Sequence, residues 1–471
     1  MKDLLKFGFF ITLVAFVLPV AITKAQQIPQ SREQISLSFS PLVKSAAPAV
    51  VNIYTKTVVQ TRKRNSPFAG DPFFDRFFGD GFGFGQPRER VKNSLGSGVI
   101  LDPSGIVVTN FHVIRGATEI RVALNDRREF NAEPILLDER TDMAFLKLDV
   151  DDEVFPFLEL RDSDTVEIGD LVLAIGNPFG VGQTVTSGIV SALARTGIGV
   201  NDYSFFIQTD AAINPGNSGG ALVTVDGKLA GVNTAIYSRS GGSNGIGFAI
   251  PSSMVKVLFE NAKHGKAIVR PWLGLEGQVL TSDLAEGLGI GRSGGVIVTR
   301  VHPNSPAALA GLDKGDVILA LDGQEVLDTQ AFRFRLGTKS VGAVAVLTVW
   351  KDRVEQDLVL ELIAPPETVL RKETKIEGRS PFTGATVVNL SPAVSEEMEL
   401  FGEWEGVAVT DVERGSPAAY SRFRVGDLIL SVNGVQIDSV ADLLDIANRA
   451  LRQWEITYKR AGRVLKIRLA F

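Results

Sequence analysis

Ser218 is the residue of this chain whose surroundings are best suited to nucleophilic catalysis. It lies in the run Asn-Pro-Gly-Asn-Ser-Gly-Gly at residues 214–220, where small residues allow backbone N–H groups to approach a reacting carbonyl group. A serine hydroxyl is too weakly acidic to attack at neutral pH, so it needs a base, a group that orients the base, and donors for the oxyanion. His112 is the candidate base, and Asp142 is the candidate acid.

Each of these residues has a defined role in acyl transfer. His112 would take the hydroxyl proton of Ser218 during attack and later return it to the leaving amine. Asp142 would hold the imidazole in one tautomer and stabilise the imidazolium that forms. The backbone N–H groups of Gly216, Asn217 and Ser218 are candidates for the oxyanion hole, where the loss of one donor typically costs roughly 2.7–4 kcal/mol.

The chain has only three histidines, so the choice of base is narrow. His264 is typical of a solvated helix end, and His302, which precedes a proline, is typical of a loop. Neither competes well with His112. A purely structural alternative, in which all three triad candidates are ordinary turn or core residues, is disfavoured because they occur in one compatible order.

The serine run also matches G-x-S-x-G, the nucleophile elbow of a different hydrolase fold. That elbow requires a strand before the serine, a helix after it, and the chain order serine, acid, histidine. Residues 221–232 instead predict two short strands around an Asp-Gly turn. The chain order here is histidine, acid, serine, so the elbow is disfavoured on both grounds.

The composition describes the chain in which these residues must be positioned. A length of 471 residues indicates about three domains, and 45% hydrophobic residues are typical of a globular protein. The net charge of −5 gives no reason to expect a nucleic-acid partner. The sequence has no cysteine and no histidine cluster, so we expect neither disulfides nor a metal, and we expect no cofactor. It also lacks a phosphate-binding G-x-x-x-x-G-K-[ST] loop, so ATP dependence is not expected.

The N-terminus has the pattern of a secretory signal peptide. Lys2 and Lys6 precede an apolar run at residues 7–22, and Ala25 follows as a small residue at a cleavage site. The run is shorter than the roughly 20 residues that a spanning helix needs. We therefore predict a cleaved signal peptide at residues 1–25, with an uncleaved membrane anchor as the alternative.

Residues from about 37 to 260 are rich in short strand and turn patterns, which favour a barrel or a sandwich. A stretch rich in Phe and Gly, residues 65–92, interrupts them and fits neither a helical nor a strand period. Disordered segments are usually poor in aromatic residues. Two interpretations therefore stay open: a disordered loop, or phenylalanines that dock on another subunit or elsewhere on this one.

The C-terminal half contains an internal repeat. Residues 295–326 reappear at residues 406–437, and 14 of these 32 ungapped positions are identical. The spacing of 111 residues is the size of a domain and too long for a solenoid period. This half therefore consists of two copies of one small module, joined near Pro365 and Pro366.

Taken together, these motifs resemble the HtrA (protease Do) family of serine endopeptidases over essentially the full length. The resemblance implies a mostly β protein: a chymotrypsin/trypsin-like double β-barrel of two six-stranded barrels, followed by two PDZ domains. It implies that His112, Asp142 and Ser218 form the triad. The implied boundaries are 1–25 signal peptide, 26–262 protease domain with a Phe/Gly-rich regulatory loop at about 60–93, 263–366 first PDZ domain, 367–379 linker and 380–471 second PDZ domain.

The resemblance also assigns residues around the triad. Ile213, Tyr237 and Ile246 match positions that line the S1 pocket, which implies small or medium apolar P1 side chains. Tyr237 is bulkier than the aliphatic residue usual there. Arg195 matches the loop that senses activation in the family. The Phe/Gly-rich stretch matches a long regulatory loop that can plug active sites across oligomers.

PDZ domains bind extended C-terminal peptides by adding a strand to a sheet edge. In the first module the loop that would hold the peptide carboxylate consists of Trp272, Leu273, Gly274 and Leu275, with Arg270 nearby as an added cation. In the second module the counterpart is residues 382–386, which depart from the pattern. For that module, packing between subunits is an equal alternative to peptide binding.

The resemblance implies an exported, ATP-independent endopeptidase of the bacterial periplasm. It would degrade unfolded or misfolded envelope proteins, with substrate C-termini docking on the first PDZ module of a trimer or a multiple of trimers. A periplasmic holdase chaperone that uses the same apolar surfaces is the alternative. A PDZ scaffold with an inactive protease domain is a third hypothesis, disfavoured by the intact triad.

Overall fold

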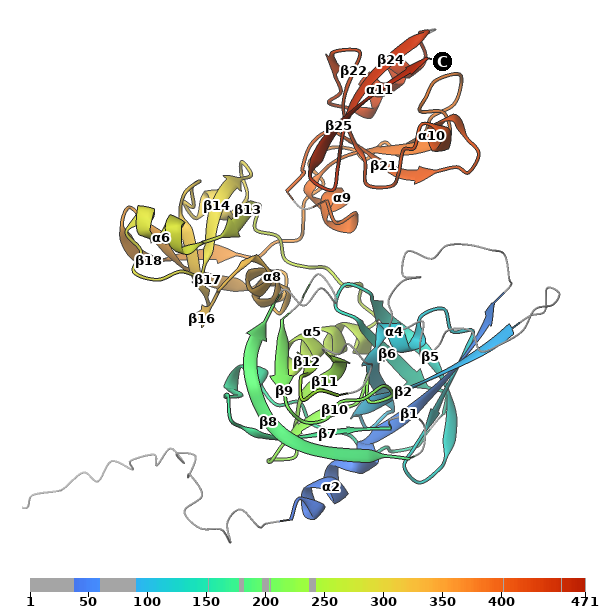
Figure 1. Cartoon of the computed structure of the whole chain (residues 1–471), viewed down its shortest axis with the longest axis vertical. Coiled ribbons are helices and arrows are strands. Elements are labelled where there is room, and N and C mark those ends of the chain that lie inside the picture. The colour runs from blue at the N-terminus through green and yellow to red at the C-terminus, as the bar shows by residue number, and fades with distance from the viewer. Residues whose placement is uncertain are drawn as a thin grey trace, which may run out of the picture.

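The computed structural model describes residues 38–59, 90–150, 152–177, 182–196, 203, 205–236, 243–400, 402–449 and 451–470. The predicted signal peptide, nearly all of the Phe/Gly-rich loop, and Tyr237 lie outside these ranges. The chain is mostly β, as predicted, and Figure 1 shows the N-terminal barrels and two smaller bodies that follow them along the chain.

Six strands close the first barrel, in the order β1-β2-β3-β6-β5-β4. Strand β3 is buried throughout, as a short apolar run in a barrel core should be. Helix α2 (Ser40–Ala46) and the 3₁₀ turn η1 (Ala47–Ala49) precede the barrel. The strands are β1 (Val50–Val59), β2 (Arg90–Asp102), β3 (Ile106–Asn110), β4 (Glu119–Ala123), β5 (Glu129–Asp138) and β6 (Met143–Leu148), with the one-turn helix α4 (Phe111–Ile114) after β3.

The second barrel is also closed, in the order β10-β11-β12-β9-β8-β7. The two strands predicted after Ser218 are β10 and β11, joined by the Asp226–Gly227 turn. Helix α5 (Ser252–Lys263) follows the barrel and buries one apolar face against it. The other elements are η2 (Ser163–Thr165), β7 (Leu171–Gly176), β8 (Thr184–Arg195), β9 (Phe206–Thr209), β10 (Ala221–Thr224), β11 (Leu229–Ile236) and β12 (Gly247–Pro251).

The two barrels share a core. One hydrophobic cluster includes Val99 and Phe145 from the first barrel together with Ile175 and Val223 from the second. The backbone continues this contact, because the N–H of Ser97 donates to the carbonyl of Ser218 at 2.9 Å. The serine loop is thereby attached to strand β2 of the opposite barrel.

The first repeat forms a sheet in the order β13-β14-β15-β17-β18, with β16 on β15. Strand β13 lies at one edge, and no described strand pairs with its outer side. The elements are β13 (Leu275–Val279), α6 (Ser282–Leu288), β14 (Val296–Val301), α7 (Pro306–Leu309), β15 (Val317–Leu321), β16 (Gln324–Glu325), α8 (Thr329–Gly337), β17 (Val344–Lys351) and β18 (Val354–Glu361).

The second repeat has the same order with one strand added: β19-β20-β21-β22-β24-β25, with β23 on β22. The additional strand β19 covers the edge that stays open in the first repeat. The elements are β19 (Thr374–Lys375), β20 (Ala385–Asn389), α9 (Pro392–Glu397), β21 (Val407–Val412), α10 (Pro417–Tyr420), β22 (Leu428–Val432), β23 (Val435–Gln436), α11 (Val440–Ala447), β24 (Gln453–Arg460) and β25 (Arg463–Ala470).

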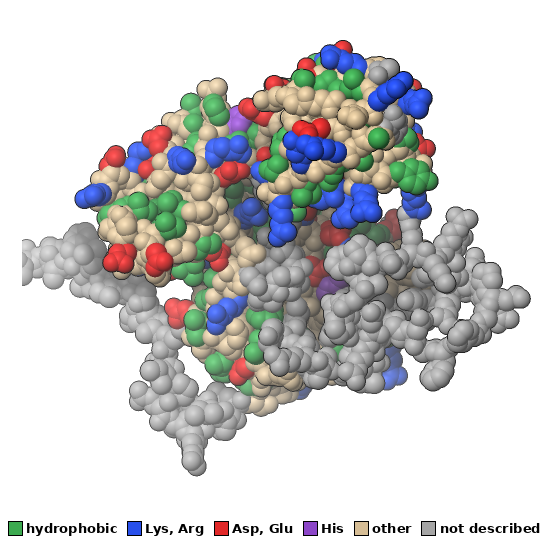
Figure 2. Space-filling view, turned by 45° about the horizontal axis from the view of Figure 1, so that its top comes forward, with side chains coloured by type: hydrophobic (Ala, Val, Ile, Leu, Met, Phe, Trp, Pro, Cys, Tyr) green, Lys and Arg blue, Asp and Glu red, His purple; other side chains and the backbone are tan. Residues whose placement is uncertain are grey.

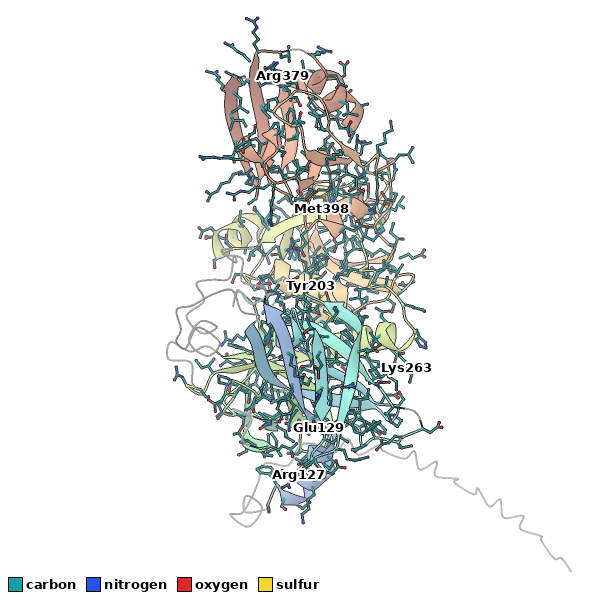
Figure 3. All side chains as sticks on the ribbon, turned by 90° about the vertical axis from the view of Figure 1, so that its right-hand side faces the viewer. Arg127, Glu129, Tyr203, Lys263, Arg379 and Met398 are labelled. Carbon is teal, nitrogen blue, oxygen red and sulfur yellow. The ribbon has the colours of Figure 1, made fainter. Side chains whose placement is uncertain are left out.

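Tyr203 lies where the three bodies approach one another (Figure 3). The guanidinium carbons of Arg140 and Arg270 lie over its ring, 5.3 and 4.7 Å from the ring centroid. Next to it, Phe205 of the second barrel stacks on Phe334 of α8 with ring centroids 4.1 Å apart. The contacts of Arg270 and Phe334 hold the first repeat against the two barrels.

The surface carries both signs of charge. On the face in Figure 2, acidic and basic side chains are interspersed over both PDZ modules, which agrees with the net charge of −5. Within the described ranges, none of the helices has the length and apolar character needed to cross a membrane.

Candidate active site

Strand pairing brings His112 and Asp142 together. Strand β3 ends at Asn110, which lies opposite Met143 at the start of β6, so the residues just beyond these two positions are neighbours. The Nδ1 atom of His112 lies 2.7 Å from Oδ2 of Asp142, and the backbone N–H of His112 donates to Oδ1 at 3.0 Å. Both carboxylate oxygens therefore hold the histidine.

The backbone around Asp142 is held in place from two sides. The N–H of Phe111 and the side-chain Nδ2 of Asn110 both donate to the carbonyl of Asp142, at 3.0 and 3.1 Å. Asp142 has a φ of +57°, a left-handed conformation that aspartate tolerates better than most residues. Sequence reasoning missed Asn110, although its position two residues before the candidate base is a usable signal.

Burial and the ion pair act in opposite directions on these two groups. Burial by itself lowers the pKa of His112, but the Asp142 carboxylate outweighs it, and the pKa lies above the ordinary 6.5. Burial by itself raises the pKa of Asp142. Its contacts with His112 and with the hydroxyl of Thr234 outweigh burial and hold the pKa below the ordinary 3.8. The pair therefore favours an ionised aspartate beside a readily protonated imidazole.

Thr234 on β11 connects the candidate nucleophile to the candidate acid. The hydroxyl of Ser218 donates to the carbonyl of Thr234 at 3.2 Å, and the hydroxyl of Thr234 donates to Oδ2 of Asp142 at 2.9 Å. Thr234 is buried, so its bond to Asp142 is shielded from water, while the bond from Ser218 is partly exposed. Sequence reasoning missed this residue because a threonine in a buried strand carries no motif.

The serine loop orders the candidate oxyanion donors. The hydroxyl of Ser97 donates to the carbonyl of Gly216 at 2.6 Å, and Gly216 has a φ of +100°. The N–H of Asn217 donates to the carbonyl of Asn214 at 3.0 Å and is therefore used within the loop. The N–H groups of Gly216 and Ser218 have no acceptor among the described residues, so they are the two donors that the geometry leaves for an oxyanion.

Gly219 is required where the loop meets the first barrel. It has a φ of +84°, and an added Cβ would overlap the carbonyl oxygen of Ser97 and the hydroxyl of Thr109. Thr109 itself donates to that carbonyl at 2.7 Å. A glycine here thus allows the serine loop to approach β2 closely.

Two of the three predicted S1 residues are described. Ile213 is buried, and its Cδ1 would lie only 2.7 Å from a Cβ added at Gly247. Ile246, the residue before Gly247, is partly buried against the shared core. Both side chains are apolar, as an apolar P1 pocket requires, while the third residue, Tyr237, lies outside the described ranges.

The predicted activation sensor is at the end of β8. Nε of Arg195 donates to Oε1 of Gln208 on β9 at 3.1 Å. The following residue, Thr196, donates its hydroxyl to Asp328, which caps α8 of the first PDZ module. This stretch therefore contacts the PDZ module directly.

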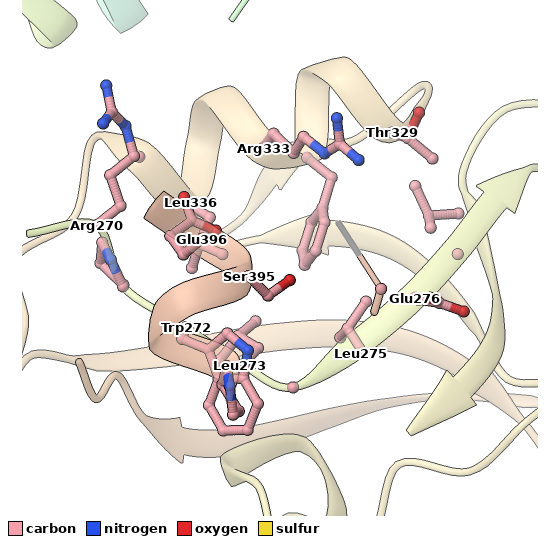
Figure 4. A pocket seen from close by; sticks show the side chains of 18 of the residues that line it. Arg270, Trp272, Leu273, Leu275, Glu276, Thr329, Arg333, Leu336, Ser395 and Glu396 are labelled. Carbon is pink, nitrogen blue, oxygen red and sulfur yellow. The ribbon is translucent and has the colours of Figure 1, made fainter. Parts of the chain in front are cut away.

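The predicted carboxylate loop lines a pocket of about 280 Å³ in the first PDZ module. Figure 4 shows Trp272, Leu273 and Leu275 on one side and α8, with Arg333 and Leu336, on the other. Arg270 lines the pocket as well, but Nη2 of its guanidinium donates to both carboxylate oxygens of Asp138 in the first barrel, at 2.9 and 2.7 Å. Arg270 thus joins the PDZ module to the protease domain.

Helix α9 of the second PDZ module contributes to this pocket. Ser395 and Glu396 line it, and Figure 4 shows their helix beside α8. Nη1 of Arg140 in the first barrel donates to Oε1 of Glu396 at 2.8 Å. Trp404 also lines the pocket, and the guanidinium of Arg300 lies 4.4 Å from its ring.

Comparison with known proteins agrees with this architecture. Residues 96–232 match the trypsin-like peptidase domain family, and residues 271–362 and 381–470 match the PDZ domain family. The chain is 38% identical over 458 residues to a probable periplasmic serine endoprotease DegP-like of Marinomonas sp. (strain MWYL1), covering 95% of this chain and 94% of the relative. It is 39% identical over 442 residues to the periplasmic serine endoprotease DegP of Escherichia coli (strain K12), covering 90% of each.

Solved structures agree in the same way. The HtrA-type protease AlgW with a tripeptide has a TM-score of 0.52 and 42% identity, covering 70% of this chain and 98% of that one. AlgW with a decapeptide has a TM-score of 0.51 and 45% identity, with 70% and 99% covered.

The closed barrels and the matched families define the class: a trypsin-like serine endopeptidase that carries two PDZ domains. The chain belongs to the HtrA family, whose DegP-like members are named as periplasmic serine endoproteases.

Proposed function

We propose that this protein is an ATP-independent serine endopeptidase of the periplasm that degrades unfolded or misfolded envelope proteins. The observation that carries the proposal is the contact of 2.7 Å between Nδ1 of His112 and Asp142, together with the bridge through Thr234 to Ser218. The names of the DegP-like relatives support the location. ATP-independence rests on the absence of a phosphate-binding loop from the sequence.

The mechanism is acyl transfer. His112 takes the proton of Ser218 as the hydroxyl attacks, and the ionised Asp142 stabilises the imidazolium that results. The N–H groups of Gly216 and Ser218 bind the oxyanion, and the acyl-enzyme is then hydrolysed by water with the same base. Apolar side chains of Ile213 and Ile246 favour small or medium apolar P1 residues.

Substrate capture would occur on the first PDZ module. Its edge strand β13 has no described partner on the outer side, and a substrate C-terminus can add there as a further strand. The N–H of Gly274 has no acceptor among the described residues and is suited to hold the terminal carboxylate. A homo-oligomer, either a trimer or a multiple of trimers, with the Phe/Gly-rich loop between subunits, completes the proposal.

Casein cleavage by the purified mature protein tests the nucleophile. Wild type should cleave casein without ATP, and Ser218→Ala should not, because the attacking oxygen is removed. Persistent cleavage by Ser218→Ala would overturn the assignment. Failure of the wild type to react with a fluorophosphonate, even with an activating peptide present, would instead favour an inactive scaffold.

The same variant separates proteolysis from chaperone activity. If Ser218→Ala suppresses aggregation of a denatured client at stoichiometric amounts, the protein has a holdase activity that does not depend on cleavage. If it does not, the endopeptidase function stands alone.

A further inference from the structure

The two PDZ modules build the same loop at the start of the peptide groove. Gly274 of the first and Gly384 of the second have φ values of +72° and +86°, and an added Cβ at either would lie 2.8 Å from a serine hydroxyl, that of Ser305 or Ser416. The carbonyls of both glycines accept equivalent N–H groups, from His302 at 2.7 Å and from Glu413 at 2.8 Å. The two loops are therefore directly comparable.

What lies beside the two loops differs. In the first module the N–H of Gly274 has no acceptor among the described residues. In the second module the N–H of Gly384 donates to the carbonyl of Ile376 at 2.9 Å. Ile376 belongs to the predicted linker at residues 367–379, and we call residues 370–376 of this linker the linker strap.

The linker strap runs antiparallel along β20, as a bound peptide does in β-augmentation. Thr374 lies opposite Val387 and Lys375 opposite Thr386. The N–H of Ile376 donates to the carbonyl of Ala385 at 2.8 Å. The strap thus uses the edge of the sheet that a substrate peptide would need.

The side chain of Ile376 occupies the position of a terminal peptide residue. It is 1% exposed and belongs to the core cluster that also contains Phe382 of the loop and Val440 and Leu443 of α11. The neighbouring Lys375 points outward, where Nζ pairs with Glu413 at 3.0 Å. This alternation of a buried and an exposed side chain is the pattern of a strand in a groove.

Asn389 fastens the other end of the strap to the groove. Its N–H donates to the carbonyl of Arg371 at 2.8 Å, and its Nδ2 donates to the carbonyl of Leu370 at 2.9 Å. Its Oδ1 accepts the N–H of Val440, the first residue of α11, at 2.7 Å. One side chain therefore joins the strap, β20 and α11.

We propose that the groove of the second PDZ module is an internal peptide-binding site, occupied by the chain's own linker strap with Ile376 in the terminal-residue pocket. The ligand class that fits it is an extended segment ending in a β-branched aliphatic residue. While the strap occupies the groove, the second module binds no substrate C-terminus. The proposal does not depend on proteolysis.

Tethering makes the strap a strong competitor. A ligand joined by a short linker has an effective concentration in the millimolar range. If the strap leaves the groove open about 1% of the time, the apparent affinity of an external peptide falls roughly 100-fold. A peptide at micromolar concentration would then bind the first module and not the second.

Peptide titration of the full chain tests the proposal, with Ser218→Ala present to prevent cleavage. The probe is a fluorescent peptide ending in Glu-Thr-Lys-Ile with a free carboxylate, the sequence of residues 373–376. Ile376→Asp should add one binding site per chain, because a charge cannot stay in the apolar pocket. Val369→Asp makes the same charge change at a half-exposed position outside the strap and should add none.

A disulfide lock identifies the added site. Lys375 and Thr386 are opposite residues in the register, at a spacing that suits a disulfide, and the chain has no native cysteine. In Ile376→Ala with Lys375→Cys and Thr386→Cys, the reduced protein should bind the additional peptide and the oxidised protein should not.

Three results would overturn the proposal. They are two sites of similar affinity in the unlocked chain with Ile376 intact, no added site in a folded Ile376→Asp or Ile376→Ala variant, and an added site that survives oxidation. Far-UV circular dichroism checks that each variant is folded. If the first module fails to bind peptide, the number of sites in the chain with Ile376 intact is lower, but the one site added by the Ile376 substitution is unchanged. Failure of the proposed function is therefore distinguishable from failure of this inference.

Discussion

At the scale of single residues, Thr234 has the largest role that no sequence motif announces. Its hydroxyl donates to the Asp142 carboxylate and its carbonyl accepts the Ser218 hydroxyl. A hydrogen bond to a charged group contributes about 1.5–3 kcal/mol. We expect Thr234→Val to lower kcat roughly 10- to 100-fold while KM changes little.

A matched variant checks that this loss is local. Thr224→Val removes a buried hydroxyl from the same barrel, where it bonds to Asp226 instead of the candidate triad. It should leave kcat near the wild-type value. Equal losses of kcat in both variants would assign Thr234 a purely structural role.

The ion pair of His112 with Asp142 also predicts a pH dependence. His112 must be neutral to accept a proton, and its pKa lies above 6.5 because the carboxylate outweighs burial. The rate of fluorophosphonate modification should therefore rise with pH through a midpoint above 6.5. Asp142→Asn should lower the titration midpoint of His112, because the raising charge is lost and burial remains.

The raised pKa of His112 also makes the free energy of unfolding depend on pH. The raised pKa of His112 stabilises the fold fully below the pKa of the unfolded chain, and this contribution is lost as pH rises through the folded value.

NMR titration of the histidine ring measures the midpoint directly, and His264→Gln and His302→Gln leave one histidine to observe. An unchanged midpoint in Asp142→Asn would contradict the electrostatic account.

At the scale of elements, the serine loop depends on a backbone that approaches β2 without a side chain between them. Gly219→Ala should destabilise the protease domain by several kcal/mol, since a positive φ costs about 1–2 kcal/mol and the clash with the Ser97 carbonyl adds to it. Gly227→Ala is the matched control, because Gly227 has a φ of +80° and its nearest atom is a side chain 3.6 Å away. It should cost only the backbone term of about 1–2 kcal/mol. Calorimetric unfolding of the two variants measures the difference, and similar losses would contradict a role for the close approach.

At the scale of the whole molecule, two ion pairs join the PDZ modules to strand β5 and the turn that leads to Asp142. Asp138 at the end of β5 accepts from Arg270 of the first PDZ module, and Arg140 donates to Glu396 of the second. Glu396 also lines the groove of the first module. Opening that groove therefore competes with the contact between Arg140 and Glu396.

This competition predicts the effect of breaking the pair. Glu396→Gln should raise the affinity of the first module for a C-terminal peptide about two- to fivefold, as expected for losing a partly exposed ion pair. Arg140→Gln, which also removes the ion pair of Arg140 with Glu399, should raise the affinity at least as much from outside the groove, and this excludes a direct effect of the Glu396 charge on the peptide. Glu361→Gln, an exposed charge on β18, should change nothing in fluorescence anisotropy measured with Ser218→Ala. A rise with Glu396→Gln alone would contradict the release of the second module.

The sequence by itself determined the mostly β architecture, the repeat and the three triad candidates. Local signals carried all of these: short apolar strands, turn glycines, and catalytic residue types in one chain order. Local signals also predicted the strand pair after Ser218, which excluded the nucleophile elbow.

Only the tertiary structure decided what surrounds these residues. Thr234, Asn110 and Ser97 enter the candidate site through pairings between distant strands, and the linker strap occupies a groove that the repeat alone presents as open. The sequence could not specify these partners, because a hydroxyl, an amide or an isoleucine has the same local pattern wherever it packs. Their roles follow from which strands close each barrel and which segment reaches the edge of each sheet, and those contacts are long-range.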